Sequence, residues 1–133
     1  MSNVDTVRKI YEDFGRGNIP AILEKMSPDV DCDYGHMTEV PWLMHRKGRE
    51  GVGSFFRAVA ENLEFRGFTT KEIFGSPDGL TVVALVDVDA VVKSTERPIR
   101  EVDEIHLWRF GSDGKVARFR HGVDTTRHAA ALR

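Results

Sequence analysis

The stretch that decides the fold is IREVDEIHLWRFGSDGKVARFRHGV, from Ile99 to Val123. Apolar and polar residues alternate on both sides of its central Gly-containing segment, a pattern typical of two antiparallel strands joined by a tight turn. We expect Asp113-Gly114 to be the two central residues of a type I′ turn. The facing pairs that this turn predicts are Ser112 with Lys115, Phe110 with Ala117, Trp108 with Phe119, and His106 with His121.

One face of this hairpin is mostly apolar and is expected to look toward the core. Its residues are Val102, His106, Trp108, Phe110, Ala117, Phe119, His121 and Val123, with Glu104 as the only carboxylate. The other face carries Asp103, Ile105, Leu107, Arg109, Arg118 and Arg120. A neutral imidazole in a dry pocket can take or give a proton near neutral pH. His106 and His121 are therefore candidate acid/base groups, and two histidines of the pocket wall without chemistry are the alternative.

The remaining pattern predicts an α+β domain. Helical periodicity covers residues 4–14, 19–26 and 52–63, with Asn3 or Asp5 capping the first helix and Asn18 the second. Residues 30–36, 65–74, 80–93, 99–110 and 116–123 are expected to be strands, residues 37–48 a loop, and a short helix follows Asp124 or Thr125. Successive strands with helices set apart favour helices packed on one face of a curved sheet, with a ligand pocket between the two layers.

Composition narrows the class of protein. The chain has 133 residues and a net charge of −2, which predicts one domain over 1–133 and no strong field for nucleic acid or an anionic membrane. Cys32 is the only cysteine, so an intrachain disulfide is excluded. There is no signal-peptide pattern, no membrane-spanning apolar run and no Gly-rich nucleotide motif. We expect a cytoplasmic domain without a cofactor.

Other side chains are expected near the pocket. On the strand at 30–36, Tyr34 and His36 share the face of Val30 and Cys32, which places them at the pocket mouth, with Tyr34 as a hydrogen-bond donor or as an aromatic wall. His36 could join His106 and His121 around zinc, but the sequence has no HxH or HExxH pattern, so no metal is expected. The predicted ligand contacts are His36, Trp42, Met44, Phe56, Trp108 and Phe119. Trp42 and Met44 form either a lid or part of the core.

Several motifs resemble the SnoaL-like, ketosteroid-isomerase-related branch of the nuclear-transport-factor-2-like superfamily. They are Tyr11-Glu12-Asp13-Phe14-Gly15-Arg16-Gly17-Asn18, Gly48-Arg49-Glu50-Gly51-Val52, Trp108-Arg109-Phe110, Asp113-Gly114-Lys115-Val116 and Asp124-Thr125. The resemblance implies a conical barrel, in which a curved, mostly antiparallel sheet wraps around a long helix and two N-terminal helices. It also implies a deep pocket and, commonly, a homodimer. The fold hosts isomerases, cyclases, dehydratases, epoxide hydrolases and pure binders, so it does not determine the activity.

The resemblance also suggests roles for single residues. Ile10 stands where ketosteroid isomerase has its oxyanion-hole tyrosine, Tyr34 where it has the general-base aspartate, and His106 where it has the protonated aspartate. SnoaL-like cyclases and limonene-type epoxide hydrolases place an acid/base aspartate near the position of His121. Because these residue types differ, steroid isomerisation by that set of residues is not expected.

We therefore expect a homodimer, joined through the outer sheet face, whose pocket binds a small apolar organic molecule. If the protein is an enzyme, His106 and His121 move a proton with help from Tyr34 or Glu104, in an isomerisation, cyclisation, dehydration or hydrolysis. The alternatives are a binding protein without chemistry and a dimerisation module with a collapsed pocket.

Overall fold

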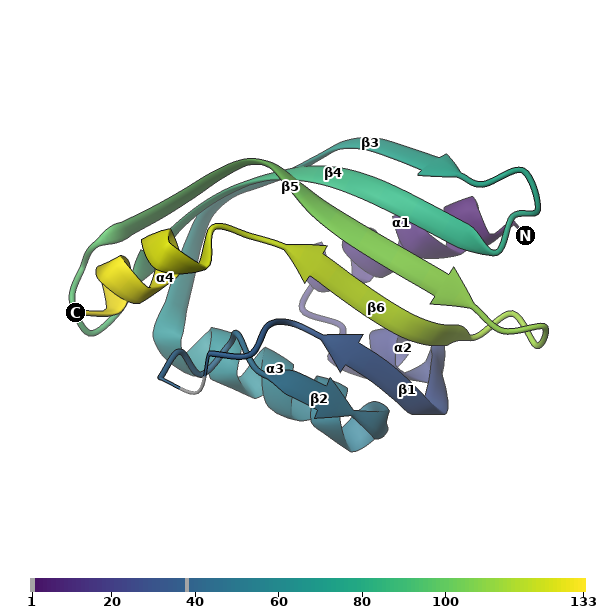
Figure 1. Cartoon of the computed structure of the whole chain (residues 1–133), viewed down its shortest axis with the longest axis horizontal. Coiled ribbons are helices and arrows are strands. Elements are labelled where there is room, and N and C mark those ends of the chain that lie inside the picture. Colours follow the sequence, from purple (N-terminus) through teal and green to yellow (C-terminus); the bar gives the residue numbers. More distant parts are fainter. Residues whose placement is uncertain (1, 38) are drawn as a thin grey trace.

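The computed structural model describes residues 2–37 and 39–133, and it confirms the α+β class. The elements in chain order are α1 (Asn3–Gly15), α2 (Ile19–Glu24), β1 (Met26–Asp33), β2 (His45–Lys47), α3 (Gly48–Asn62), β3 (Leu63–Gly75), β4 (Thr81–Val92), β5 (Pro98–Phe110), β6 (Val116–Gly122) and α4 (Thr125–Leu132). The strands form one curved, unclosed sheet in the order β2-β1-β6-β5-β4-β3. Figure 1 shows α1, α2 and α3 on one side of the sheet and α4 at the end near the β4–β5 turn.

The two N-terminal helices begin at capping residues. Ser2, not Asn3 or Asp5, is the N-cap of α1: its side chain accepts from the Asp5 N–H, and the Asp5 carboxylate accepts in return from the Ser2 N–H. Asp5 therefore completes a capping box instead of starting the helix. Asn18 caps α2 as predicted, and its side chain accepts from the N–H of Ala21.

The first strand lies earlier in the chain than its pattern indicates. β1 runs from Met26 to Asp33 instead of from 30 to 36. Its parallel pairing with β6 is irregular between Met26 and Asp31, which accommodates Pro28, a residue without an N–H. The predicted loop at 37–48 also contains the short strand β2, which pairs antiparallel with the end of β1.

The hairpin of β5 and β6 reaches the predicted histidine register by a different route. The turn is one residue wider than predicted, because Gly111 pairs with Lys115 and the Gly114 N–H donates to the Gly111 carbonyl. Phe110 then pairs with Val116 instead of Ala117. A bulge at Ala117 restores the register, so Trp108 faces Phe119 and His106 faces His121 as predicted.

A second bulge changes which side chains of β5 face the core. Val86 pairs with Glu104, whereas Val88 pairs with Glu101, so Val102 and Asp103 together oppose one residue of β4. Asp103 has a φ of 57°. Val102, predicted to point inward, is consequently 65% exposed, while Glu101 is buried.

The side chains of β4 alternate regularly between partly exposed and buried positions. On β4, five small or medium apolar side chains are buried beneath the helices: Val82, Ala84, Val86, Val88 and Ala90. The helices contribute Val7, Ile10 and Val52 to the core cluster that contains Val82. No helix in the described part of the chain is long and apolar enough to cross a membrane.

Candidate functional site

A cavity of about 110 Å³ lies between the concave face of the sheet and the helices. Aromatic and aliphatic side chains make up most of its wall, and Glu104, His106, His121 and His128 are the charged or imidazole groups that line it. A dry cavity of about 150 Å³ can hold one benzene ring. The inner chamber is therefore of single-ring size.

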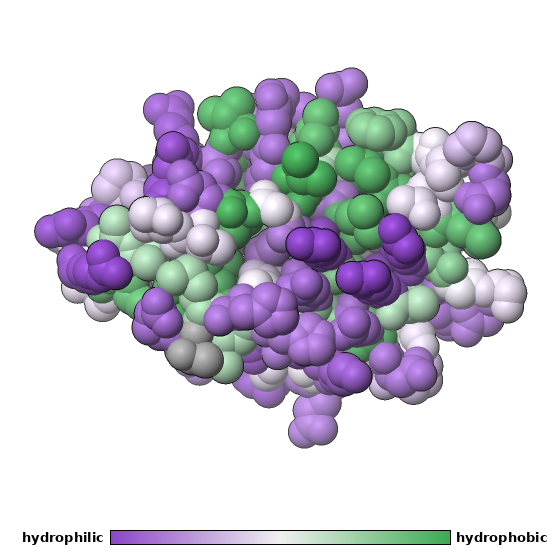
Figure 2. All heavy atoms as spheres, in the orientation of Figure 1, coloured by the Kyte–Doolittle hydropathy of each residue, from purple (hydrophilic) through white to green (hydrophobic). Residues whose placement is uncertain are grey.

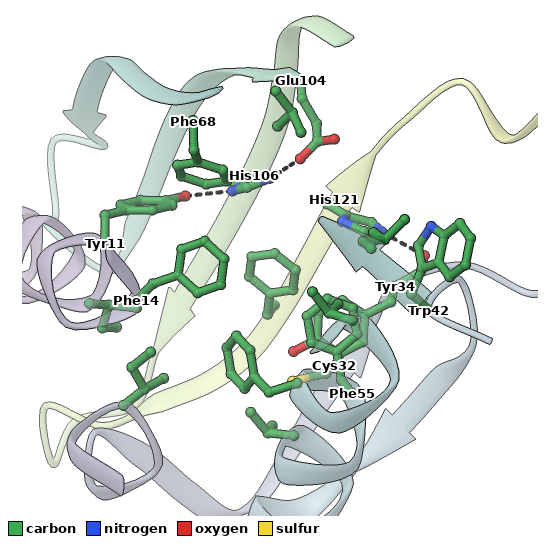
Figure 3. A pocket seen from close by; sticks show the side chains of 18 of the residues that line it. Tyr11, Phe14, Cys32, Tyr34, Trp42, Phe55, Phe68, Glu104, His106 and His121 are labelled. Carbon is green, nitrogen blue, oxygen red and sulfur yellow. Dashed lines mark hydrogen bonds and ion pairs between the residues drawn. The ribbon is translucent and has the colours of Figure 1, made fainter. Parts of the chain in front are cut away.

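One wall of the cavity carries a continuous chain of hydrogen bonds, shown in part in Figure 3. Nε2 of His106 lies 2.5 Å from Oε2 of Glu104, and its Nδ1 lies 2.6 Å from the hydroxyl oxygen of Tyr11. Nε1–H of Trp108 donates to that same hydroxyl oxygen at 3.2 Å. Glu104, His106 and Trp108 stand side by side because alternate residues of β5 share a face. The fourth member, Tyr11, comes from α1.

The protonation of these groups determines which atom donates and which accepts in each of these hydrogen bonds. Burial opposes ionisation of Glu104, but the hydrogen bond and the charge of His106 outweigh it, so the pKa of Glu104 lies below its ordinary value. An ionised carboxylate only accepts, so His106 donates through Nε2–H. When the His106 ring is neutral, its Nδ1 accepts from the Tyr11 hydroxyl; when the ring is protonated, Nδ1–H donates to that hydroxyl oxygen instead. Burial raises the pKa of Tyr11, so this hydroxyl keeps its proton.

His121 stands opposite His106, with ring centroids 6.0 Å apart. Its Nε2 lies 2.6 Å from the backbone carbonyl oxygen of Tyr34. A carbonyl only accepts, so Nε2 carries the hydrogen. Burial, with Glu104 acting in the opposite direction, lowers the pKa of His121 to about 4. The ring is therefore neutral at pH 7, with a lone pair on Nδ1.

A second polar cluster closes the cavity near α4. Nε1–H of Trp42 donates to Nδ1 of His128 at 2.9 Å, and Nε2 of His128 lies 3.1 Å from Oε1 of Glu101. The backbone N–H of Asp124 donates to the same carboxylate oxygen at 3.0 Å. Burial lowers the pKa of His128. Both of its ring nitrogens are occupied by protein partners, so this cluster anchors the Trp42 loop to α4.

Most of the predicted site residues lie at the cavity. Those that line it are His106, His121, Tyr34, Glu104, Trp42, Phe56, Trp108 and Phe119. Met44 is half-buried outside the lining, and the side chain of His36 is 74% exposed beside Asp33. The prediction for His36 is wrong because β1 ends at Asp33 and Gly35, at φ 130°, turns the chain. His36 therefore cannot join His106 and His121 around a metal.

Two polar residues of the wall were missed by the sequence analysis. Tyr11 was placed only in the expected helix at 4–14 and in a family motif, although its hydroxyl reaches His106. Ile10 also lines the cavity but brings no hydrogen-bonding group. His128 was not considered, because the bulge that turns Glu101 inward leaves no signature in the sequence. A tyrosine inside an apolar helical stripe was the one available signal.

Among residues 2–37 and 39–133, Glu104, His106 and His121 form a group that could hold a metal ion. A carboxylate oxygen and one nitrogen from each ring lie within 4.8 Å of one another. His106 would have to move its hydrogen from Nε2 to Nδ1 to become a ligand, because Nε2 now donates to Glu104. The Tyr11 hydroxyl has a second lone pair that could accept that hydrogen.

Comparison with known proteins places this geometry in a family. The sequence profile of the SnoaL-like domain matches residues 7–119. No curated protein matches the chain in sequence. An NTF2-like protein of unknown function from Burkholderia pseudomallei is 27% identical, with a TM-score of 0.86 over 99% of this chain and 98% of that chain.

Two further solved structures share the fold. TerC, co-crystallised with polyporic acid, is 23% identical, with a TM-score of 0.82 over 98% of this chain and 97% of its own. A Mycobacterium tuberculosis protein in complex with estradiol-17β-hemisuccinate is 19% identical, with a TM-score of 0.74 over 96% of this chain and 98% of its own. At this level of identity both show the fold alone.

Proposed function

Because the chain belongs to the SnoaL-like family of the NTF2-like superfamily, we propose that it binds a small apolar organic molecule and moves a proton on it, as an isomerase or cyclase does. The observation that carries this proposal is the chain Trp108–Tyr11–His106–Glu104 along one wall of an otherwise apolar cavity. Two proteins of the same fold were crystallised with small organic molecules, which supports the ligand class.

The proposed reaction uses Glu104 as the proton acceptor. Its Oε1 removes a proton from a carbon next to a ligand carbonyl, and the electron pair of the broken C–H bond passes to the carbonyl oxygen as an enolate. The neutral carboxylic acid then returns the proton to another atom of the ligand. His106 is the positioning residue, because its Nε2–H holds the carboxylate and the Tyr11 hydroxyl determines its tautomer.

His121 and Tyr34 have supporting roles in this proposal. Nδ1 of His121 is a second proton acceptor in the same cavity as Glu104, and the backbone carbonyl of Tyr34 orients its ring. The Tyr34 ring is buried against Phe55, and burial raises the pKa of its hydroxyl. Tyr34 therefore acts through its carbonyl and as a wall rather than as the donor considered from the sequence.

Deuterium exchange tests this proposal without knowledge of the natural substrate. We expect the protein to accelerate exchange of the α-hydrogens of 1-tetralone, 1-indanone or 2-cyclohexenone in D2O, measured by proton NMR. The control is buffer with the same concentration of imidazole. If no ketone exchanges faster than in this control, but the ketones still raise the melting temperature, the protein is a binder without acid/base activity.

We also propose that two copies join through the outer face of the sheet. Ile105 is 50% and Val102 is 65% exposed there. Figure 2 shows apolar residues gathered among charged ones on the upper part of this face. A homodimer would remove this apolar area from water.

Light scattering after size exclusion tests the dimer. We expect the wild-type protein to have about twice the chain mass of 15.0 kDa, and Ile105→Glu to have the chain mass, because a buried unpaired carboxylate is costly. Ile105→Val, which keeps the surface apolar, is the matched control and stays dimeric. A wild-type mass of 15.0 kDa at micromolar concentration would contradict the proposal.

A further inference from the structure

Two hydrogen-bond acceptors without a protein partner converge on the polar end of the cavity. Oε2 of Glu104 accepts from His106, whereas no donor from residues 2–37 or 39–133 reaches Oε1. Nε2–H of His121 donates to the Tyr34 carbonyl oxygen. No donor from the described residues reaches Nδ1 of His121. Figure 3 shows both side chains projecting toward the same space.

Both free atoms can be reached from that space. Among the described residues that are not exposed, the only fully enclosed side-chain nitrogen or oxygen without a partner is Nε of Arg46. Oε1 of Glu104 and Nδ1 of His121 therefore keep contact with the cavity or its water. One atom each of Glu104, His106 and His121 lies within 4.8 Å of the others, so the three side chains border one small space.

The donors around these two acceptors are already used. With His106 neutral, its Nε2–H donates to Glu104, the Tyr11 hydroxyl donates to Nδ1 of His106, and Nε1–H of Trp108 donates to the Tyr11 oxygen. A ligand carbonyl placed here would meet lone pairs only, which leaves it unsatisfied and repelled by the carboxylate. A group that brings its own hydrogen is complementary to the site.

We infer that the ligand presents a hydroxyl group, from a phenol or an enol, to Glu104 and His121. This deepens the proposed function and rests on its cavity, but it does not need turnover. If the proposed reaction forms an enol, its O–H can donate to Glu104 or His121, whereas the oxygen of the keto form finds no donor there. The pair therefore favours the hydroxyl form of a ligand that can exist in both.

The surrounding side chains indicate that this hydroxyl belongs to an aromatic ring. The inner chamber has single-ring volume, and Phe119 packs beside both histidines, with ring centroids 5.5 Å from His106 and 5.9 Å from His121. An open groove between α1, α3 and β3 shares Phe14 and Phe68 with the chamber wall. A larger ligand can therefore place one hydroxylated ring inside and the remainder in the groove.

The test compares three ligands of nearly equal shape by NMR titration in buffer with EDTA, so that a metal ion cannot supply the contact. Phenol donates, anisole can only accept, and toluene does neither. We expect phenol to bind at least roughly tenfold more tightly than anisole and toluene, because its hydrogen bond has a charged acceptor. His36→Ala, a histidine outside the cavity, is the control and keeps this preference.

Glu104→Gln turns the free acceptor into a donor while keeping the shape of the side chain. We expect it to lose the preference for phenol and to improve the relative binding of anisole, whereas Glu104→Asp keeps the preference. Equal affinities for phenol and toluene in wild-type protein would overturn the inference, whatever the exchange assay shows. A preference for phenol without ketone exchange would support it and would contradict the proposed catalysis alone.

Discussion

Glu104→Gln is expected to slow α-hydrogen exchange of the ketones by about 10²–10⁴-fold, the usual contribution of a positioned general base. The amide fits the same space and its oxygen can still accept from Nε2–H of His106. It cannot take a proton at neutral pH, so the loss isolates proton transfer from packing. Initial exchange rates of wild type and variant in D2O at pH 7 measure the effect.

Tyr11→Phe provides a graded control for the same chain of hydrogen bonds. It removes the donor to Nδ1 of His106 without touching Glu104, so we expect a smaller loss than for Glu104→Gln and a changed pH profile of the rate. Exchange by Glu104→Gln within a few-fold of wild type would show that Glu104 is not the base. We would then expect His121→Gln to lose the exchange activity, because Nδ1 of His121 is the other free proton acceptor.

The facing pair of histidines could be predicted from sequence because alternation constrains strand register more strongly than turn chemistry does. A one-residue slip would move His106, Trp108 and Phe119 to the outer face, at the cost of their burial. The chain therefore compensates a wider turn with a bulge at Ala117. The exposure of Ala117 and its loss of a partner were not predictable, because either turn fits Ser112-Asp113-Gly114-Lys115.

The second polar cluster could not be predicted for a related reason. Strict alternation along β5 places Glu101 on the outer face, opposite to Glu104. The bulge at Val102 and Asp103 reverses that order, and the Asp103 N–H then donates to Oδ1 of Asp87. Because Glu101 points inward, its carboxylate contacts Nε2 of His128. Nδ1 of the His128 ring then accepts from Nε1–H of Trp42. These contacts depend on tertiary placement of α4, which local sequence does not encode.

The position of Tyr34 shows that a correct location does not establish the predicted role. It lines the cavity as expected, but it lies beyond the last residue of β1, so its carbonyl is free of the ladder and accepts from His121. Its ring stacks on Phe55, with centroids 3.6 Å apart. A side-chain pattern could not reveal that the backbone carbonyl of this residue would be the hydrogen-bond partner of His121.

The unfolding free energy is expected to fall by on the order of 3 kcal/mol between pH 6.5 and pH 4 because of His121 alone. Burial lowers the pKa of this residue from 6.5 to about 4 in the folded protein. Between these two pH values His121 is mostly protonated in the unfolded chain and mostly neutral in the folded protein. The unfolded state is therefore stabilised relative to the folded state as the pH falls. Glu104 and His128, whose pKa values are also lowered, act in the same direction.

Urea unfolding at pH 7, 6, 5 and 4 measures this effect, and His121→Gln assigns it. Glutamine can still donate to the Tyr34 carbonyl but does not titrate, so the variant should lose less stability on acidification than wild type. His36→Gln, which removes an exposed histidine, should follow the wild-type curve. If His121→Gln kept the full wild-type slope, the His121 imidazole would not be held neutral against the Tyr34 carbonyl. The free lone pair on Nδ1, on which the hydroxyl selectivity of the cavity depends, would then be absent as well.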